Sequence, residues 1–238
     1  MEKKLKSMYI LFHHKTSHVP PNLSRILDLS VFWLMGIFIF LNPFPHVTSL
    51  KEIAFYLSVA LVVFGMVTRK LDFSFKTPLT LPFVLFSAWA ALGLFFALDP
   101  ENSLHDFYAH LLKYLAFYYI LVNCCRTQKR LDRLSWIIIL SATAFCVGAL
   151  GYEYWVLGEN VENPRFGVRF VQTPTNLMGV VTLFALILTV HYLTKKHVSW
   201  EVRVFLGFCL LSILSVTVLT QSRSNFVAMG VVSVILLS

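Results

Sequence analysis

Long apolar runs recur along the whole sequence, and they constrain its fold more than any other feature. Each run approaches the ~20 residues that an α-helix needs to cross a lipid bilayer, once flanking residues are counted. Eight such runs can be marked: Ile26–Leu41, Ile53–Val67, Leu79–Leu98, Phe107–Val122, Leu134–Gly151, Leu177–Leu193, Val204–Leu219 and Phe226–Leu237. We therefore predict an all-α, polytopic membrane protein with about eight transmembrane helices, in which residues 1–238 form a single integral membrane domain.

The composition agrees with this prediction. The chain is 57% hydrophobic and 13% charged, with a mean hydropathy of +0.71. Soluble domains are near 45–50% apolar and about 25% charged, so the higher apolar and lower charged fractions of this chain indicate a membrane protein. The last run is still apolar where the sequence stops at Ser238. We therefore expect this chain to be part of a longer protein.

Basic residues predict the orientation. Fifteen Lys and Arg residues fall in the segments on the N-terminal side of the membrane, including the basic tail over residues 1–25, and only Lys51, Arg165, Arg169 and Arg223 fall in the others. Because basic residues are enriched on the cytoplasmic side, we expect a cytoplasmic N-terminus. Topology thereby accounts for most of the net charge of +8 without a nucleic-acid partner.

Three arginines run against this trend and are candidate binding residues. Arg165 and Arg169 precede the sixth run, and Arg223 lies in the polar break Thr220–Asn225 between the seventh and eighth. A guanidinium presents a fork of donors that suits phosphate, so three on one membrane face would suit a lipid-linked phosphate or pyrophosphate. In the alternative reading, Arg223 only anchors a helix end and nearby glutamates neutralise the other two.

Lys113 and Asn176 are two further candidates. Lys113 lies about two turns into the fourth run, on one helical face with His110, and an ionisable residue at that depth usually faces a cavity or a partner helix. The alternative is that Lys113 snorkels to the outer surface among tyrosines. Asn176 follows Pro174-Thr175 at the start of the sixth run, where it can cap a helix or help to bind an anion at the helix N-terminus.

No motif indicates a metal or a cofactor. Four cysteines, Cys124, Cys125, Cys146 and Cys209, lie within or beside apolar runs without CxxC spacing, so we expect buried thiols rather than disulfides or a zinc site. The sequence contains no Ser/His/Asp arrangement, P-loop or dinucleotide fingerprint that we can identify. We therefore expect neither a metal nor a cofactor, and no catalytic base is identifiable among these residues.

Two motifs resemble the O-antigen ligase/polymerase family. The first is Arg165-Phe-Gly-Val-Arg169 followed by Thr173-Pro174-Thr175-Asn176, and the second is Leu219-Thr220-Gln221-Ser222-Arg223. The family has an outer arginine segment, a Pro-Asn start to a helix and a later Thr-x-Ser-Arg junction. Here the Pro-Asn pair is spread over three residues, and either Arg165 or Arg169 could correspond to the family arginine. The resemblance covers mainly Arg165–Leu237.

The resemblance implies a glycosyltransferase that moves a glycan from polyprenyl pyrophosphate to a sugar hydroxyl, of the lipid A core in ligases or of another repeat unit in polymerases. It also implies that outer arginines hold the pyrophosphate on the periplasmic face, that no metal or nucleotide sugar is needed, and that a histidine beyond residue 238 is the general base. Two alternatives stay open. A transporter or flippase of an anionic lipid-linked substrate would use the same outer cations, and in a membrane scaffold without a ligand the arginines would only anchor helix ends.

Overall fold

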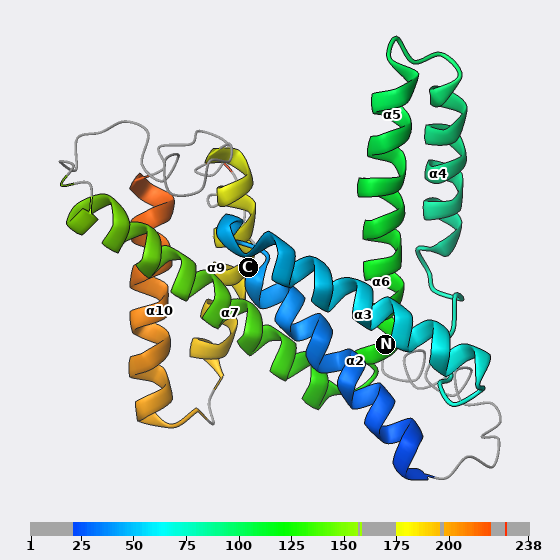
Figure 1. The fold of residues 1–238 in the computed structure, drawn as a ribbon. Coiled ribbons are helices and arrows are strands. Elements are labelled where there is room, and N and C mark those ends of the chain that lie inside the picture. The colour runs from blue at the N-terminus through cyan, green and yellow to red at the C-terminus, as the bar shows by residue number, and fades with distance from the viewer. Residues whose placement is uncertain (1–20, 157, 159–174, 196–197, 220–226, 228–238) are drawn as a thin grey trace. The chain divides into compact units, whose positions relative to one another are not determined.

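The computed structural model describes residues 21–156, 158, 175–195, 198–219 and 227, and these residues form helices without a β-strand among them (Figure 1). The α-helices are α2 (Pro21–Leu41), α3 (Thr48–Val67), α4 (Thr80–Leu94), α5 (Pro100–Asp106), α6 (Lys113–Cys124), α7 (Gln128–Gly151), α9 (Thr175–Thr194) and α10 (Trp200–Leu219). Shorter segments are the 3-10 helix η1 (Pro45–Val47) and the π-helical η2 (Phe107–Leu112) and η3 (Tyr152–Val156). The all-α prediction is confirmed for the described part of the chain.

Four of the described helical stretches are long and apolar enough to cross a membrane. They are Leu23–Leu41, Pro45–Val67, Gln128–Val156 and Trp200–Leu219. Two further apolar helices, Thr80–Leu94 and Val181–Thr194, are shorter. The predicted run Phe226–Leu237 lies outside the described residues except for Val227. These lengths and compositions are those of a helical membrane protein.

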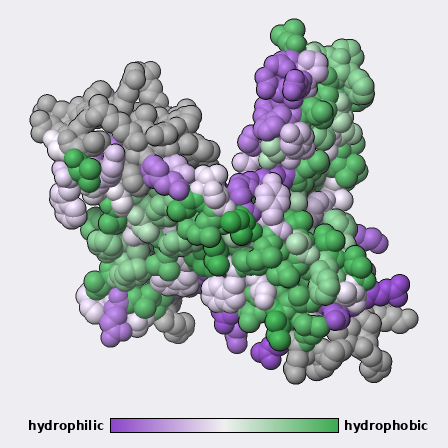
Figure 2. All heavy atoms as spheres, in the orientation of Figure 1, coloured by the Kyte–Doolittle hydropathy of each residue, from purple (hydrophilic) through white to green (hydrophobic). Residues whose placement is uncertain are grey.

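The chain divides into two compact units. The first contains Met1–Trp33 and Leu57–Cys124, and the second contains Leu34–Tyr56 and Cys125–Ser238. Many large apolar side chains are exposed in both, among them Trp89 and Phe208. Figure 2 shows hydrophobic residues over much of the surface, whereas hydrophilic residues gather over α5. An apolar surface of this extent suits contact with lipid rather than with water.

In the first unit, α4 packs beside the continuous helix formed by α5, η2 and α6. Hydrogen bonds join the segment that precedes α4 to the last turn of α6. The Asn123 side chain accepts from the Ser74 backbone N–H and donates to the Ser74 carbonyl, both at 2.9 Å. Tyr118 Oη donates to Thr77 Oγ1 at 3.2 Å, and its ring packs edge-on against Phe83. Tyrosines of the fourth apolar run therefore join the two arms of the hairpin.

Residues 100–106, which lie between the third and fourth apolar runs, form the short helix α5. Asp99 caps α5 by accepting a hydrogen bond from the Asn102 backbone N–H at 3.2 Å, and Pro100 occupies the first helical position, where its missing N–H costs nothing. Proline here starts a helix, and the aspartate before it supplies the cap.

The second unit is built around α7, α9 and α10, which pack against one another. One buried cluster joins the C-terminal half of α7 to α9 and α10 through Cys146, Ala185 and Ile213. A second cluster joins the N-terminal half of α7 to the C-terminal part of α9 and the N-terminal part of α10. The order of the residues in both clusters means that α9 runs antiparallel to α7 and α10.

Small and hydroxyl-bearing residues allow these helices to approach closely. Buried threonines donate to the carbonyl four residues earlier, as Thr189 Oγ1 does to Ala185 and Thr217 Oγ1 does to Ile213, both at 2.7 Å. Ser141 Oγ donates to the Phe40 carbonyl at 2.6 Å and so links α7 to the end of α2. Such pairing is required because an unsatisfied polar group in a packed interior is costly.

Candidate functional site

The two arginine segments predicted from the sequence adjoin helix ends of the second unit. α9 begins at Thr175, six residues after Arg169, and α10 ends at Leu219, four residues before Arg223. Because α9 and α10 are antiparallel neighbours, the start of α9 and the end of α10 lie at the same end of this pair (Figure 1). Arg165, Arg169 and Arg223 themselves lie outside the described residues.

Asn176 lies in the first turn of α9, since this helix begins one residue earlier at Thr175. The first backbone N–H groups of a helix have no partner within the helix, and they bear the positive end of its dipole. This places the backbone of Asn176 where an anion can be stabilised. Lys113, the other described candidate, belongs to the first unit.

Glu153 is a buried acid that the sequence interpretation treated only as a loop charge. It lies in η3, directly after α7, and only 4% of its surface is exposed. Within the described part of the chain, its Oε1 atom has no hydrogen-bond partner. A buried carboxylate loses several kcal/mol of hydration unless other groups offset the loss.

Lys113 is half-buried at the first position of α6, immediately after the π-helical η2. π-Helical segments are rare and occur frequently at functional sites. One turn earlier, His110 stacks on Tyr114 with ring centroids 6.3 Å apart, and His110 Nε2 lies 3.6 Å from Asp106 Oδ1. His105 Nδ1 lies 3.8 Å from the same oxygen. Lys113 thus adjoins an exposed cluster of one carboxylate and two imidazoles.

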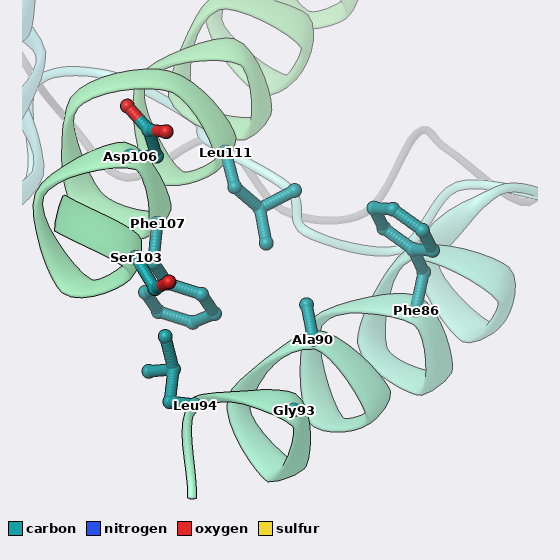
Figure 3. A pocket seen from close by; sticks show the side chains of 8 residues that line it. All are labelled: Phe86, Ala90, Gly93, Leu94, Ser103, Asp106, Phe107 and Leu111. Atoms are coloured by element: carbon teal, nitrogen blue, oxygen red, sulfur yellow. The ribbon is translucent and has the colours of Figure 1, made fainter. Parts of the chain in front are cut away.

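An open groove lies next to this cluster, between α4 and the α5–η2 helix. Its volume is about 390 Å³. Phe86 and Ala90 of α4 point toward Phe107 and Leu111 of η2 across the groove (Figure 3). The remaining lining residues are Gly93, Leu94, Ser103 and Asp106. The groove is therefore mostly apolar, with one carboxylate among the residues that line it.

Another polar cluster lies in the second unit, at the opposite end of the α9–α10 pair from the start of α9. Tyr192 Oη of α9 donates to Asp132 Oδ1 of α7 at 2.6 Å. Lys195 Nζ lies 3.5 Å from the same oxygen and 4.1 Å from the centroid of the Tyr192 ring. Arg203 of α10 donates to the Lys195 carbonyl at 3.4 Å. These contacts tie α7, α9 and α10 together, and we assign them a structural role.

The described residues contain no group of three or more His, Cys, Asp or Glu side chains that could hold a metal ion. None of the four cysteines forms a disulfide with another described residue, and Cys124, Cys146 and Cys209 are buried, as expected. Cys125 is half-buried between α6 and α7, and burial raises the pKa of its thiol to about 11, with Arg130 opposing the shift. A thiol with this pKa is protonated at neutral pH and is a poor nucleophile.

Comparison with known proteins adds one match. Residues 38–152 match a family of unknown function, DUF5935. This match spans both units and ends before the arginine segments. No curated protein and no solved structure matches the chain.

Proposed function

We propose that the protein is an envelope glycan ligase of the O-antigen ligase type. It transfers a glycan from a polyprenyl pyrophosphate donor to a sugar hydroxyl of the lipid A core, at the periplasmic face of the bacterial inner membrane. A polymerase of the same family would use the same donor and transfer the glycan to another repeat unit. We assign donor binding to residues 1–238 and identify no general base among them.

One structural observation supports this proposal more than any other. The start of α9 and the end of α10, which adjoin the two arginine segments in sequence, lie at one end of an antiparallel helix pair. Segments that enter and leave the membrane at the same end can contribute to one site. The resemblance of Arg165–Asn176 and Leu219–Arg223 to the motifs of the family supplies the chemistry.

The topology that we propose has eight spans with the N-terminus in the cytoplasm. The first seven predicted runs coincide with described helices, and the basic residues alternate as the positive-inside rule requires. The hairpin of α4 with α5, η2 and α6 then contributes the third and fourth spans. In this orientation the start of α9 and the end of α10 face the periplasm, and the Asp132–Tyr192–Lys195 cluster faces the cytoplasm.

The arginines would act on the leaving group. Departure of the glycan leaves extra negative charge on the pyrophosphate, and preorganised cations at the edge of the bilayer stabilise charge as it develops. Arginine suits this task because its fork of donors matches two phosphate oxygens and stays charged at every relevant pH. Asn176 and the first turn of α9 would add backbone donors. Stabilising the leaving pyrophosphate in this way requires no metal.

The test is glycan transfer by the protein expressed from its complete gene, in one strain without its own ligase and in another without its own polymerase. Arg223→Ala should lower transfer about ten- to hundred-fold, since loss of a charge-assisted contact costs roughly 1.5–3 kcal/mol. Arg223→Lys should restore part of it, because an ammonium keeps the charge without the fork. The strain that is rescued distinguishes ligase from polymerase. Normal transfer by Arg223→Ala at normal protein level would refute the proposal.

A further inference from the structure

The groove between α4 and the α5–η2 helix has the shape and lining of a site for a lipid chain. Apolar side chains from both helices point toward one another across it, and its volume of about 390 Å³ is within the range of small-ligand sites (Figure 3). Neighbouring apolar residues such as Trp89 are exposed. In the proposed topology the groove lies within the membrane, close to its outer surface.

Charged and polar groups at one end of the groove restrict which headgroup can bind. Asp106 is the acidic residue among the lining side chains, and Asp99 and Glu101 lie within two turns of it on the same short helix. Three carboxylates disfavour a headgroup with net negative charge. They favour a headgroup that contains a cation.

Two imidazoles lie beside the same carboxylate. His105 Nδ1 and His110 Nε2 are 3.8 and 3.6 Å from Asp106 Oδ1. An imidazole donates a hydrogen bond even when it is neutral, and it donates two when it is protonated. A carboxylate acceptor flanked by two such donors is complementary to a headgroup that has an ammonium and a phosphate next to each other.

We propose that this groove binds an aminophospholipid. An acyl chain lies between Phe86 and Ala90 on one side and Phe107 and Leu111 on the other. The primary ammonium donates to Asp106, and the phosphate accepts from His105 and His110. A primary ammonium has three N–H donors, whereas a quaternary choline has none, so phosphatidylethanolamine is favoured over phosphatidylcholine. The inference depends on the proposed topology and is independent of glycan transfer.

The experiment is native mass spectrometry of the purified full-length protein, released from nanodiscs that contain phosphatidylethanolamine, phosphatidylcholine and phosphatidylglycerol with identical acyl chains. We expect phosphatidylethanolamine to be retained about tenfold over the other two, the value of one charge-assisted hydrogen bond. Asp106→Asn should abolish this preference. Glu201→Gln is the control and should keep the preference, because Glu201 is an exposed acid in the first turn of α10, which belongs to the other unit.

A second pair of variants tests the apolar part without removing a charge. A Cβ atom added at Gly93, which lines the groove, meets nothing within 4 Å, so the leucine side chain of Gly93→Leu starts in open space and we expect it to occupy part of the groove. It should reduce retention of phosphatidylethanolamine to the level of the other two lipids. Gly207 of α10 is equally open, and Gly207→Leu should have no effect.

Three outcomes would overturn the proposal. They are equal retention of the three lipids, preference for phosphatidylcholine or phosphatidylglycerol, and an unchanged preference in both Asp106→Asn and Gly93→Leu. Arg223→Ala should keep the preference, so failure of the lipid site and failure of the proposed donor site are distinguishable.

Discussion

Removal of a single hydroxyl, by Tyr192→Phe, tests how the second unit is held together. Tyr192 is 7% exposed, and its Oη donates to Asp132 Oδ1 at 2.6 Å across the contact between α7 and α9. The substitution keeps the buried ring and removes the hydrogen bond. A hydrogen bond to a charged group is worth roughly 1.5–3 kcal/mol, and the lower end applies because 37% of the Asp132 side chain is exposed and can rehydrate. We therefore expect a loss of about 1.5 kcal/mol.

Unfolding of the purified protein in mixed micelles, followed by circular dichroism, measures this loss. Lys195→Ala should cost only about 0.5–1 kcal/mol, because a partly exposed ion pair and a cation–π contact are each weak. In a double-mutant cycle, Tyr192→Phe and Asp132→Asn should be non-additive. The exposed Tyr114→Phe is the control and should be neutral. A neutral Tyr192→Phe, or full additivity with Asp132→Asn, would show that this cluster does not hold α7 to α9.

Three further predictions concern single residues. Arg69 has φ of 54° after the end of α3, a conformation that favours glycine, so Arg69→Gly should stabilise the protein by about 1 kcal/mol in the same unfolding assay; destabilisation would contradict this assignment. Ser87 Oγ is buried without a partner in the described part of the chain, so Ser87→Ala should leave the free energy of unfolding unchanged or raise it. Ser141→Ala removes a 2.6 Å hydrogen bond and should lower it by about 1 kcal/mol. Equal effects of the two substitutions would refute this prediction. In a variant whose only cysteine is Cys125, maleimide should react with this thiol about 100-fold more slowly at neutral pH than with a thiol of pKa near 9. The reaction should become faster as the pH rises toward 11. The rate of an ordinary exposed thiol at neutral pH would show that burial does not shift this pKa.

Much of the fold could be predicted from apolar run length, because a helix that crosses a bilayer has to be apolar over a nearly fixed number of residues. Helix ends were harder to predict, as α5 shows. Its seven residues are polar, and its start depends on a local hydrogen bond from Asn102 to Asp99 that no apolar pattern reveals.

The polar clusters could not be predicted, because they depend on tertiary packing. Asp132 and Tyr192 are sixty residues apart in sequence, and their contact exists only because α7 and α9 are packed neighbours. Glu153 has the sequence environment of a loop acid and is nevertheless buried. The groove beside Asp106 depends on the placement of α4 against the π-helical η2. The roles of Arg165, Arg169 and Arg223 remain predictions from the sequence.

Direct binding of a polyprenyl pyrophosphate tests the central claim. The protein expressed from its complete gene, purified and reconstituted in nanodiscs, would be titrated with the labelled lipid. The wild type and Arg203→Ala, a control arginine near the other end of α10, should bind alike, and Arg223→Ala should bind about ten- to hundred-fold more weakly. Equal binding by Arg223→Ala and the wild type, or no binding by the wild type, would contradict the claim that these arginines hold the donor.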